Sequence, residues 1–85
     1  MQCIKEVLVR IPEGLHHQAA TRFIQTANRF DSAIRITYGD HSVNAKSLLG
    51  VLSLSIGSGA ELTLSAGGAD AEAALAALEQ ALTES

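Results

Sequence analysis

The sequence has few cysteine, proline and aromatic residues, and each shortage excludes a class of protein. With one cysteine, Cys3, the chain cannot form an intramolecular disulfide, so a reducing, cytoplasmic location is expected. Two phenylalanines and one tyrosine, without tryptophan, are too few rings for a platform that stacks nucleic-acid bases.

Positive charge and long apolar runs are also scarce. Six Lys and Arg residues stand against nine Asp and Glu residues, and the net charge of −3 argues against a nucleic-acid footprint. No basic segment followed by an apolar run opens the sequence, so no signal peptide is expected. The longest uncharged stretch, residues 47–60, is too short and too rich in glycine and serine for membrane insertion.

The spacings that bind metals and cofactors are absent as well. His16, His17 and His41 have no cysteine or carboxylate at ligand spacing, so no metal site is expected. The segments Gly57-Ser58-Gly59 and Gly67-Gly68 lack the ending of a phosphate-binding loop and are interpreted as turns. We therefore expect no cofactor.

The sequence does contain a regular succession of strand and helix patterns. Alternating apolar residues predict four strands, over residues 2–11, 33–38, 41–45 and 60–66. Apolar residues at helical spacing predict three helices, over residues 17–28, 47–54 and 71–83. The order β-α-β-β-α-β-α predicts an α+β fold: an open-faced β-sandwich whose four-stranded antiparallel sheet carries three helices on one face.

Turn and cap residues separate these elements. Pro12-Glu13-Gly14 is expected to stop the first strand, and Gly39-Asp40 to form a hairpin turn. Asp70 is a good N-cap for the last helix. A chain of 85 residues is expected to form a single domain.

The tetrad Gly14-Leu15-His16-His17 opens the first predicted helix with imidazoles instead of the usual Ser, Thr, Asp or Asn cap. The free N–H groups and the positive end of the helix dipole attract anions, phosphate above all. An imidazole at this point could carry a phosphoryl group. The alternative is a solvent-exposed histidine that fills a poor cap.

A second segment, from Asn44 to Gly50, precedes and opens the short second helix. Ser47 is a sound N-cap, and a phosphate placed there would add nearly two negative charges where the dipole tolerates them. The apolar arc of this helix is wider than one buried stripe needs, so some of Leu48, Leu49 and Leu52 are expected to be exposed. We interpret them as a docking patch for a partner; the alternative is a fuller core.

Both segments and the order of elements resemble the HPr family, the histidine-containing phosphocarriers of the bacterial sugar phosphotransferase system. Gly14-Leu15-His16 matches the start of the family's active site, and residues 44–54 (NAKSLLGVLSL) match the regulatory-serine region of Gram-positive members. The resemblance covers essentially the whole of residues 1–85 and implies one HPr-like domain with strand order 1-4-2-3.

The resemblance also implies roles and partners. His16 falls on the phosphorylated histidine, and Ser47 falls on the regulatory serine. The protein would be a stoichiometric carrier and not a classical enzyme, accepting phosphoryl from enzyme I and passing it to enzyme IIA proteins. A serine kinase/phosphorylase and a LacI-type transcriptional regulator are the further partners that the family implies.

Two departures weaken the active-site match: Gln18 stands where the family has arginine, and Ala19 where it has proline. The family usually has Gly-Leu-His-Ala-Arg-Pro-Ala, whereas this chain has His17, Gln18 and Ala19 after His16. Gln18 replaces an arginine that steadies the phosphoryl group, and losing a charge-assisted hydrogen bond costs about 1.5–3 kcal/mol. Transfer is therefore expected to be slower. A protonated His17 would partly replace the lost cation, or is an incidental neighbour.

These departures leave a second function open. Regulatory paralogues of HPr act in catabolite repression through the phosphorylated serine and a transcriptional regulator, with little or no phosphotransfer. Gln18 and Ala19 favour such a regulatory protein, and the presence of His16 favours the carrier.

Overall fold

The computed structural model describes residues 2–12 and 14–83, which form four strands and three helices. In chain order they are β1 (Gln2–Leu8), α1 (His17–Ala27), β2 (Ala33–Tyr38), β3 (His41–Asn44), α2 (Leu48–Ser53), β4 (Glu61–Gly67) and α3 (Ala71–Thr83). The predicted order β-α-β-β-α-β-α is confirmed. None of the helices in the described residues is long and apolar enough to cross a membrane.

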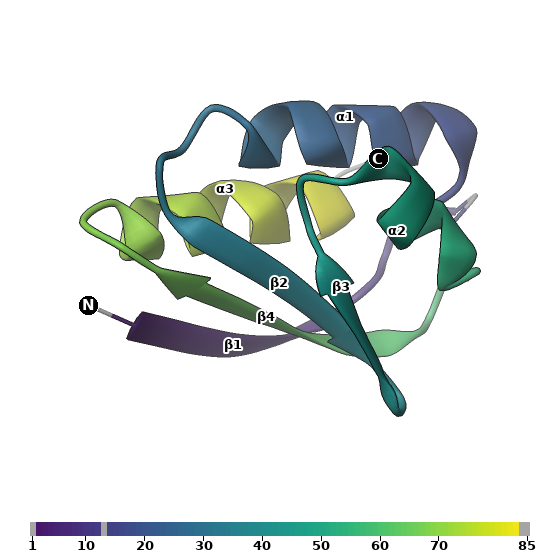
Figure 1. Ribbon diagram of the computed structural model, residues 1–85. Helices are drawn as coiled ribbons and strands as arrows, with labels where there is room; N and C mark the ends of the chain where they lie inside the picture. The colour runs from purple at the N-terminus through teal and green to yellow at the C-terminus, as the bar shows by residue number, and fades with distance from the viewer. Residues whose placement is uncertain (1, 13, 84–85) are drawn as a thin grey trace.

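The strands form one antiparallel sheet with the order β1-β4-β2-β3, as the resemblance implied. The register places inward apolar residues opposite one another: Val7 faces Leu62, and Ile36 faces Leu64. Figure 1 shows α1 and α3 lying side by side over one face of this sheet, with α2 beside the start of α1. The open-faced sandwich is therefore confirmed.

Between this sheet face and the helices lies the hydrophobic core. Alternate strand residues and the apolar stripes of α1 and α3 meet there because each element has one apolar side. The largest fully buried apolar side chains are Val9, Ile11, Leu15, Phe23, Ile34, Ile36, Val51, Ile56, Leu64, Leu78 and Leu82.

The first strand is shorter than predicted. The alternation of burial continues to Ile11, but the ladder ends at Leu8, opposite Glu61 at the beginning of β4. Beyond this point three hydrogen bonds hold Val9 and Arg10. Val9 N donates to the Ala60 carbonyl (2.8 Å), the Val9 carbonyl accepts from Gly59 N (2.8 Å), and Arg10 N donates to the Leu82 carbonyl (2.9 Å). Of the residues expected to stop the strand, Glu13 lies outside the described ones.

Asp70 occupies the N-cap position of α3, as predicted, because its carbonyl accepts from the Ala74 N–H at 2.9 Å. Its carboxylate accepts hydrogen bonds from the backbone N–H groups of Asp31 (2.9 Å) and Ser32 (3.0 Å) and from the Ser32 hydroxyl. The Ser32 hydroxyl above all, then the Asp31 N–H, holds the pKa of Asp70 below its ordinary value. The start of α3 is thereby tied to the loop between α1 and β2.

Candidate functional site

The turn before the candidate histidine is fixed by a close approach of two backbones. Gly14 has a φ of +73°, and a Cβ at this position would lie 2.8 Å from both the Ile56 oxygen and the Gly57 Cα. The next residue, Leu15, is buried, and its N–H donates to the Ile56 carbonyl at 2.8 Å. The segment that follows α2 therefore holds the start of α1 in place.

His16 is the N-cap residue of α1 and is exposed to solvent. Its backbone is extended (φ −120°, ψ 156°), and its carbonyl accepts from the N–H groups of Ala19 (2.9 Å) and Ala20 (3.3 Å). Within the described part of the chain, the His16 ring makes no capping hydrogen bond. The imidazole is therefore accessible, at the end of a helix whose first N–H groups favour anions.

The helix begins on an unusual backbone conformation. His17 has a φ of +35°, a region that residues other than glycine rarely adopt. The side chains of His17, Gln18, Thr21 and Arg22 line a shallow depression along the first two turns of α1. The predicted neighbours of the phosphate, His17 and Gln18, thus share one surface with Thr21 and Arg22. Thr21 and Arg22 were not predicted as site residues, although Thr21 follows His17, and Arg22 follows Gln18, by four residues.

The second candidate segment caps α2 as predicted. The Ser47 hydroxyl oxygen accepts from the Gly50 N–H at 3.2 Å, and the Ser47 carbonyl accepts from the Val51 N–H at 3.0 Å. Asn44 and Lys46 position this cap: the Asn44 side-chain oxygen accepts from the Lys46 N–H at 2.9 Å. The Lys46 ammonium group donates to the Phe30 carbonyl at 2.7 Å.

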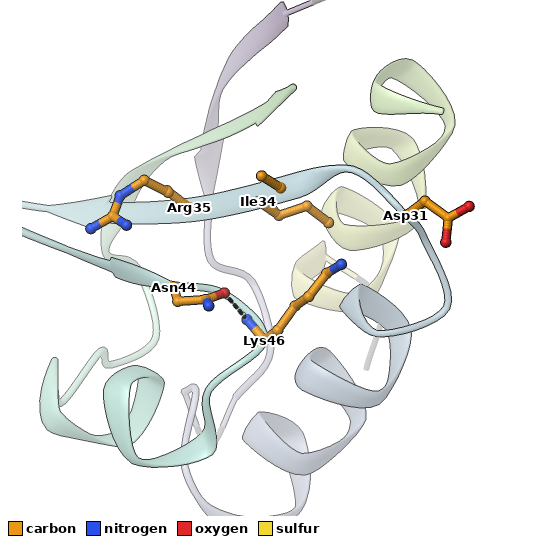
Figure 2. A pocket seen from close by; sticks show the side chains of 6 residues that line it. Asp31, Ile34, Arg35, Asn44 and Lys46 are labelled. Atoms are coloured by element: carbon orange, nitrogen blue, oxygen red, sulfur yellow. Dashed lines mark hydrogen bonds between the residues drawn. The ribbon is translucent and has the colours of Figure 1, made fainter. Parts of the chain in front are cut away.

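Figure 2 shows the side chains of Asn44 and Lys46 in a second depression, which is also lined by Asp31, Ile34 and Arg35. Its two cationic side chains have partners within the protein: Lys46 binds the Phe30 carbonyl, and Arg35 donates through Nε to the Ser42 hydroxyl and through a terminal nitrogen to the Ser42 carbonyl, both at 3.0 Å. We therefore assign this depression to the support of β2, β3 and the Ser47 cap.

The leucines of α2 divide between surface and core. Leu49 is 82% exposed and Leu48 is 37% exposed, whereas Leu52 is partly buried and packs against the core. Val51 and Leu54 are buried beneath them. The exposed apolar surface of α2 therefore consists mainly of Leu48 and Leu49.

The two candidate segments lie at the same end of the molecule. The start of α1 and the whole of α2 are neighbours in Figure 1, and the two helices pack against each other. His41, by contrast, begins β3 beyond the hairpin turn. Among the described residues, no three His, Cys, Asp or Glu side chains come together as metal ligands.

Residues 4–84 match the family described as the PTS HPr component phosphorylation site. The chain belongs to the HPr family. HPr proteins of the phosphotransferase system carry phosphoryl groups and do not act as classical enzymes, and membership implies interaction with enzymes of that system.

Solved structures of HPr proteins are closely similar to this HPr-family chain. The phosphocarrier protein HPr from Bacillus anthracis str. Ames is 42% identical, with a TM-score of 0.93, over 95% of this chain and 96% of that one. HPr-C-His from Thermoanaerobacter tengcongensis is 36% identical, with a TM-score of 0.89, over 98% of both chains.

A relative named for catabolite repression has a comparable sequence identity. Crh, the catabolite repression containing protein of Bacillus subtilis, is 40% identical, with a TM-score of 0.78, over 94% of this chain and 92% of that one. Sequence identity therefore does not separate a carrier from a regulator, and the residues around His16 and Ser47 must do so.

Proposed function

We propose that this HPr-family protein accepts a phosphoryl group on His16 from enzyme I of the sugar phosphotransferase system and passes it to enzyme IIA proteins. The observation that carries the proposal is the exposed His16 imidazole, held at the first turn of α1 without a capping bond of its own among the described residues. Nucleophilic transfer needs such a ring.

The transfer follows from the position of His16. A neutral ring nitrogen attacks phosphorus, the bond from phosphorus to the donor group of enzyme I breaks, and the ring releases its proton to solvent. The N–H groups that open α1 precede its first intrahelical hydrogen bonds and favour the charge of the phosphoryl oxygens. Transfer to enzyme IIA runs through the same steps in reverse, with a nucleophile of enzyme IIA as acceptor.

Docking and regulation would use the neighbouring helix. Leu48, Leu49 and the partly buried Leu52 would form the apolar part of the surface that partners cover, with Ser47 at its edge. Because Ser47 is already an N-cap, a phosphate there is compatible with α2, but it would place about two negative charges beside an incoming phosphorylated partner. A serine kinase/phosphorylase acting on Ser47 would thus control docking.

The second candidate function is regulation in catabolite repression through phosphorylated Ser47 and a LacI-type regulator, with little or no phosphotransfer. The departures at Gln18 and Ala19 favour it, since they remove the arginine and proline that the family has beside its histidine. The 40% identity to Crh is compatible with this function.

The test follows both steps of the transfer, acceptance from enzyme I and donation to enzyme IIA. We expect incubation with enzyme I and labelled phosphoenolpyruvate to give acid-labile, base-stable phosphate, which enzyme IIA then removes. A protein that takes up no label from enzyme I, but binds the regulator once Ser47 is phosphorylated, would show the second function instead.

A further inference from the structure

One of the six Lys and Arg residues, Arg22, lines the depression at the start of α1. Of the others, Lys5 pairs with Glu79 (2.8 Å), Lys46 binds the Phe30 carbonyl and Arg35 binds Ser42. Arg10 lies on the segment that follows β1. Arg29 follows the far end of α1. Among the described residues, Arg22 is the one Lys or Arg within α1, and it lies in the second turn after His16.

The position of Arg22 in the helix brings it back toward the active-site turn. Gln18 and Arg22 are separated by one turn, so their side chains are neighbours on one face. Helical side chains point toward the N-terminus, and a long side chain covers the turn before its own Cα. Arg22 is exposed and lines the same depression as His17 and Gln18.

An arginine at this place suits a phosphoryl group. Its planar guanidinium group offers several N–H donors that match phosphate oxygens and keeps its charge at every physiological pH. Gln18 offers a neutral amide at the corresponding position one turn earlier.

We propose that Arg22 contacts the phosphoryl group carried by His16 and supplies the positive charge that position 18 lacks. This inference rests on the proposed function, because it concerns the same phosphoryl group. The first-turn N–H groups of α1 bind one side of the phosphoryl group, and the Arg22 guanidinium group reaches it across the depression from the side of Gln18.

The test measures His16 labelling with two donors, phosphorylated enzyme I and phosphoramidate. Phosphoramidate is small: its P–N bond breaks, ammonia leaves and a His16 ring nitrogen bonds to phosphorus, so no docking surface takes part. We expect Arg22→Gln to slow labelling by both donors roughly 10- to 150-fold, the effect of one charge-assisted hydrogen bond. Arg22→Lys should retain part of the rate.

Two matched variants make the result specific. Arg29→Gln removes the same charge roughly 20 Å along the helix axis from His16, and should change the rates by less than about 2-fold. Adding Gln18→Arg to Arg22→Gln should restore most of the lost rate, because the new arginine occupies the neighbouring position on the same face.

An unchanged rate with phosphoramidate in Arg22→Gln would overturn the inference, and a loss confined to enzyme I would do so too, since it would make Arg22 a docking residue. Failure of the proposed function is distinct. In that case the unaltered protein would take no acid-labile phosphate from enzyme I.

Discussion

At residue scale, the exposure of His16 depends on its neighbours more than on His16 itself. Leu15 is buried and bonded to Ile56, and Gly14 lets the chain pass against Gly57 with a positive φ. These two residues place the imidazole at the surface while the preceding backbone remains fixed. A phosphoryl acceptor needs both properties, since misplacement of a reacting group slows transfer.

Gly14→Ala tests this placement. An alanine Cβ would meet backbone atoms at 2.8 Å in a conformation that side chains disfavour, so we expect a loss of about 1–3 kcal/mol in the free energy of unfolding and slower His16 labelling. Urea unfolding and initial labelling rates measure the two effects. Gly57→Ala is the control, because a Cβ there meets nothing within 4 Å. Equal stability of the two variants would contradict the account of the turn.

The residues around His16 could be predicted only in part. The imidazole at a helix start, the Ser47 cap and the surplus of leucines in α2 follow from local chemistry and helical spacing. The positive φ of His17 does not, because no glycine marks it. The place of Arg22 also escapes prediction, since a polar helix face shows which residues meet solvent but not which of them line one depression.

At the scale of elements, the periodicity of apolar residues predicts which residues are buried better than it predicts which residues form hydrogen bonds. Every predicted helix and strand is present, because each apolar face is covered by the sheet or by a helix. The predicted end of β1 was wrong because Val9 and Ile11 remain buried after the hydrogen-bonded ladder has ended at Leu8. The link from the Asp70 carboxylate to Ser32 was not predicted, since a cap motif does not show a partner 38 residues away in the sequence.

Asp70→Asn tests the link between α3 and the loop that precedes β2. The pKa of Asp70 in the folded protein is lowered from 3.8, foremost by the Ser32 hydroxyl, so its contribution to stability is fully present above about pH 4. The contribution is lost as the pH falls through the lowered folded-state pKa. We expect Asp70→Asn to be less stable at pH 7, and the difference to shrink below pH 4.

Thermal unfolding of both proteins between pH 2 and pH 7 measures that difference. Asp40→Asn, in the exposed hairpin turn, is the control for loss of one carboxylate. A stability difference that stays constant over this pH range would contradict the assigned cause.

The α2 helix carries the proposed docking surface, and two substitutions test it. Ser47→Asp, a partial mimic of the phosphate, and Leu49→Glu should each slow labelling by enzyme I several-fold or more, because both place negative charge where a phosphorylated partner docks. Circular dichroism and thermal unfolding should change little, since Leu49 is 82% exposed.

Ile4→Glu is the matched control: Ile4 is 68% exposed, but it lies on the edge strand β1. It should leave the rate unchanged. The docking assignment fails if all three variants retain the rate of the unaltered protein, and it also fails if Ile4→Glu slows labelling as much as Leu49→Glu.

At the scale of the whole molecule, the strand order β1-β4-β2-β3 brings together two segments that lie about 30 residues apart in the sequence. The start of α1 and α2 share one end of the molecule in Figure 1, and the loop with Ser32 meets the start of α3 at the other. The end with His16 and Ser47 is the one that we propose for partners, while the Asp70 carboxylate ties the start of α3 to the loop at the opposite end.

The identity of the acceptor is the central claim, and it has one direct measurement. The initial rate and final amount of acid-labile phosphate after incubation with enzyme I and phosphoenolpyruvate should be determined for the unaltered protein, His16→Ala and His17→Ala. We predict that His16→Ala removes all acid-labile phosphate and that His17→Ala keeps most of it. Loss of labelling in His17→Ala, with labelling retained in His16→Ala, would contradict the assignment.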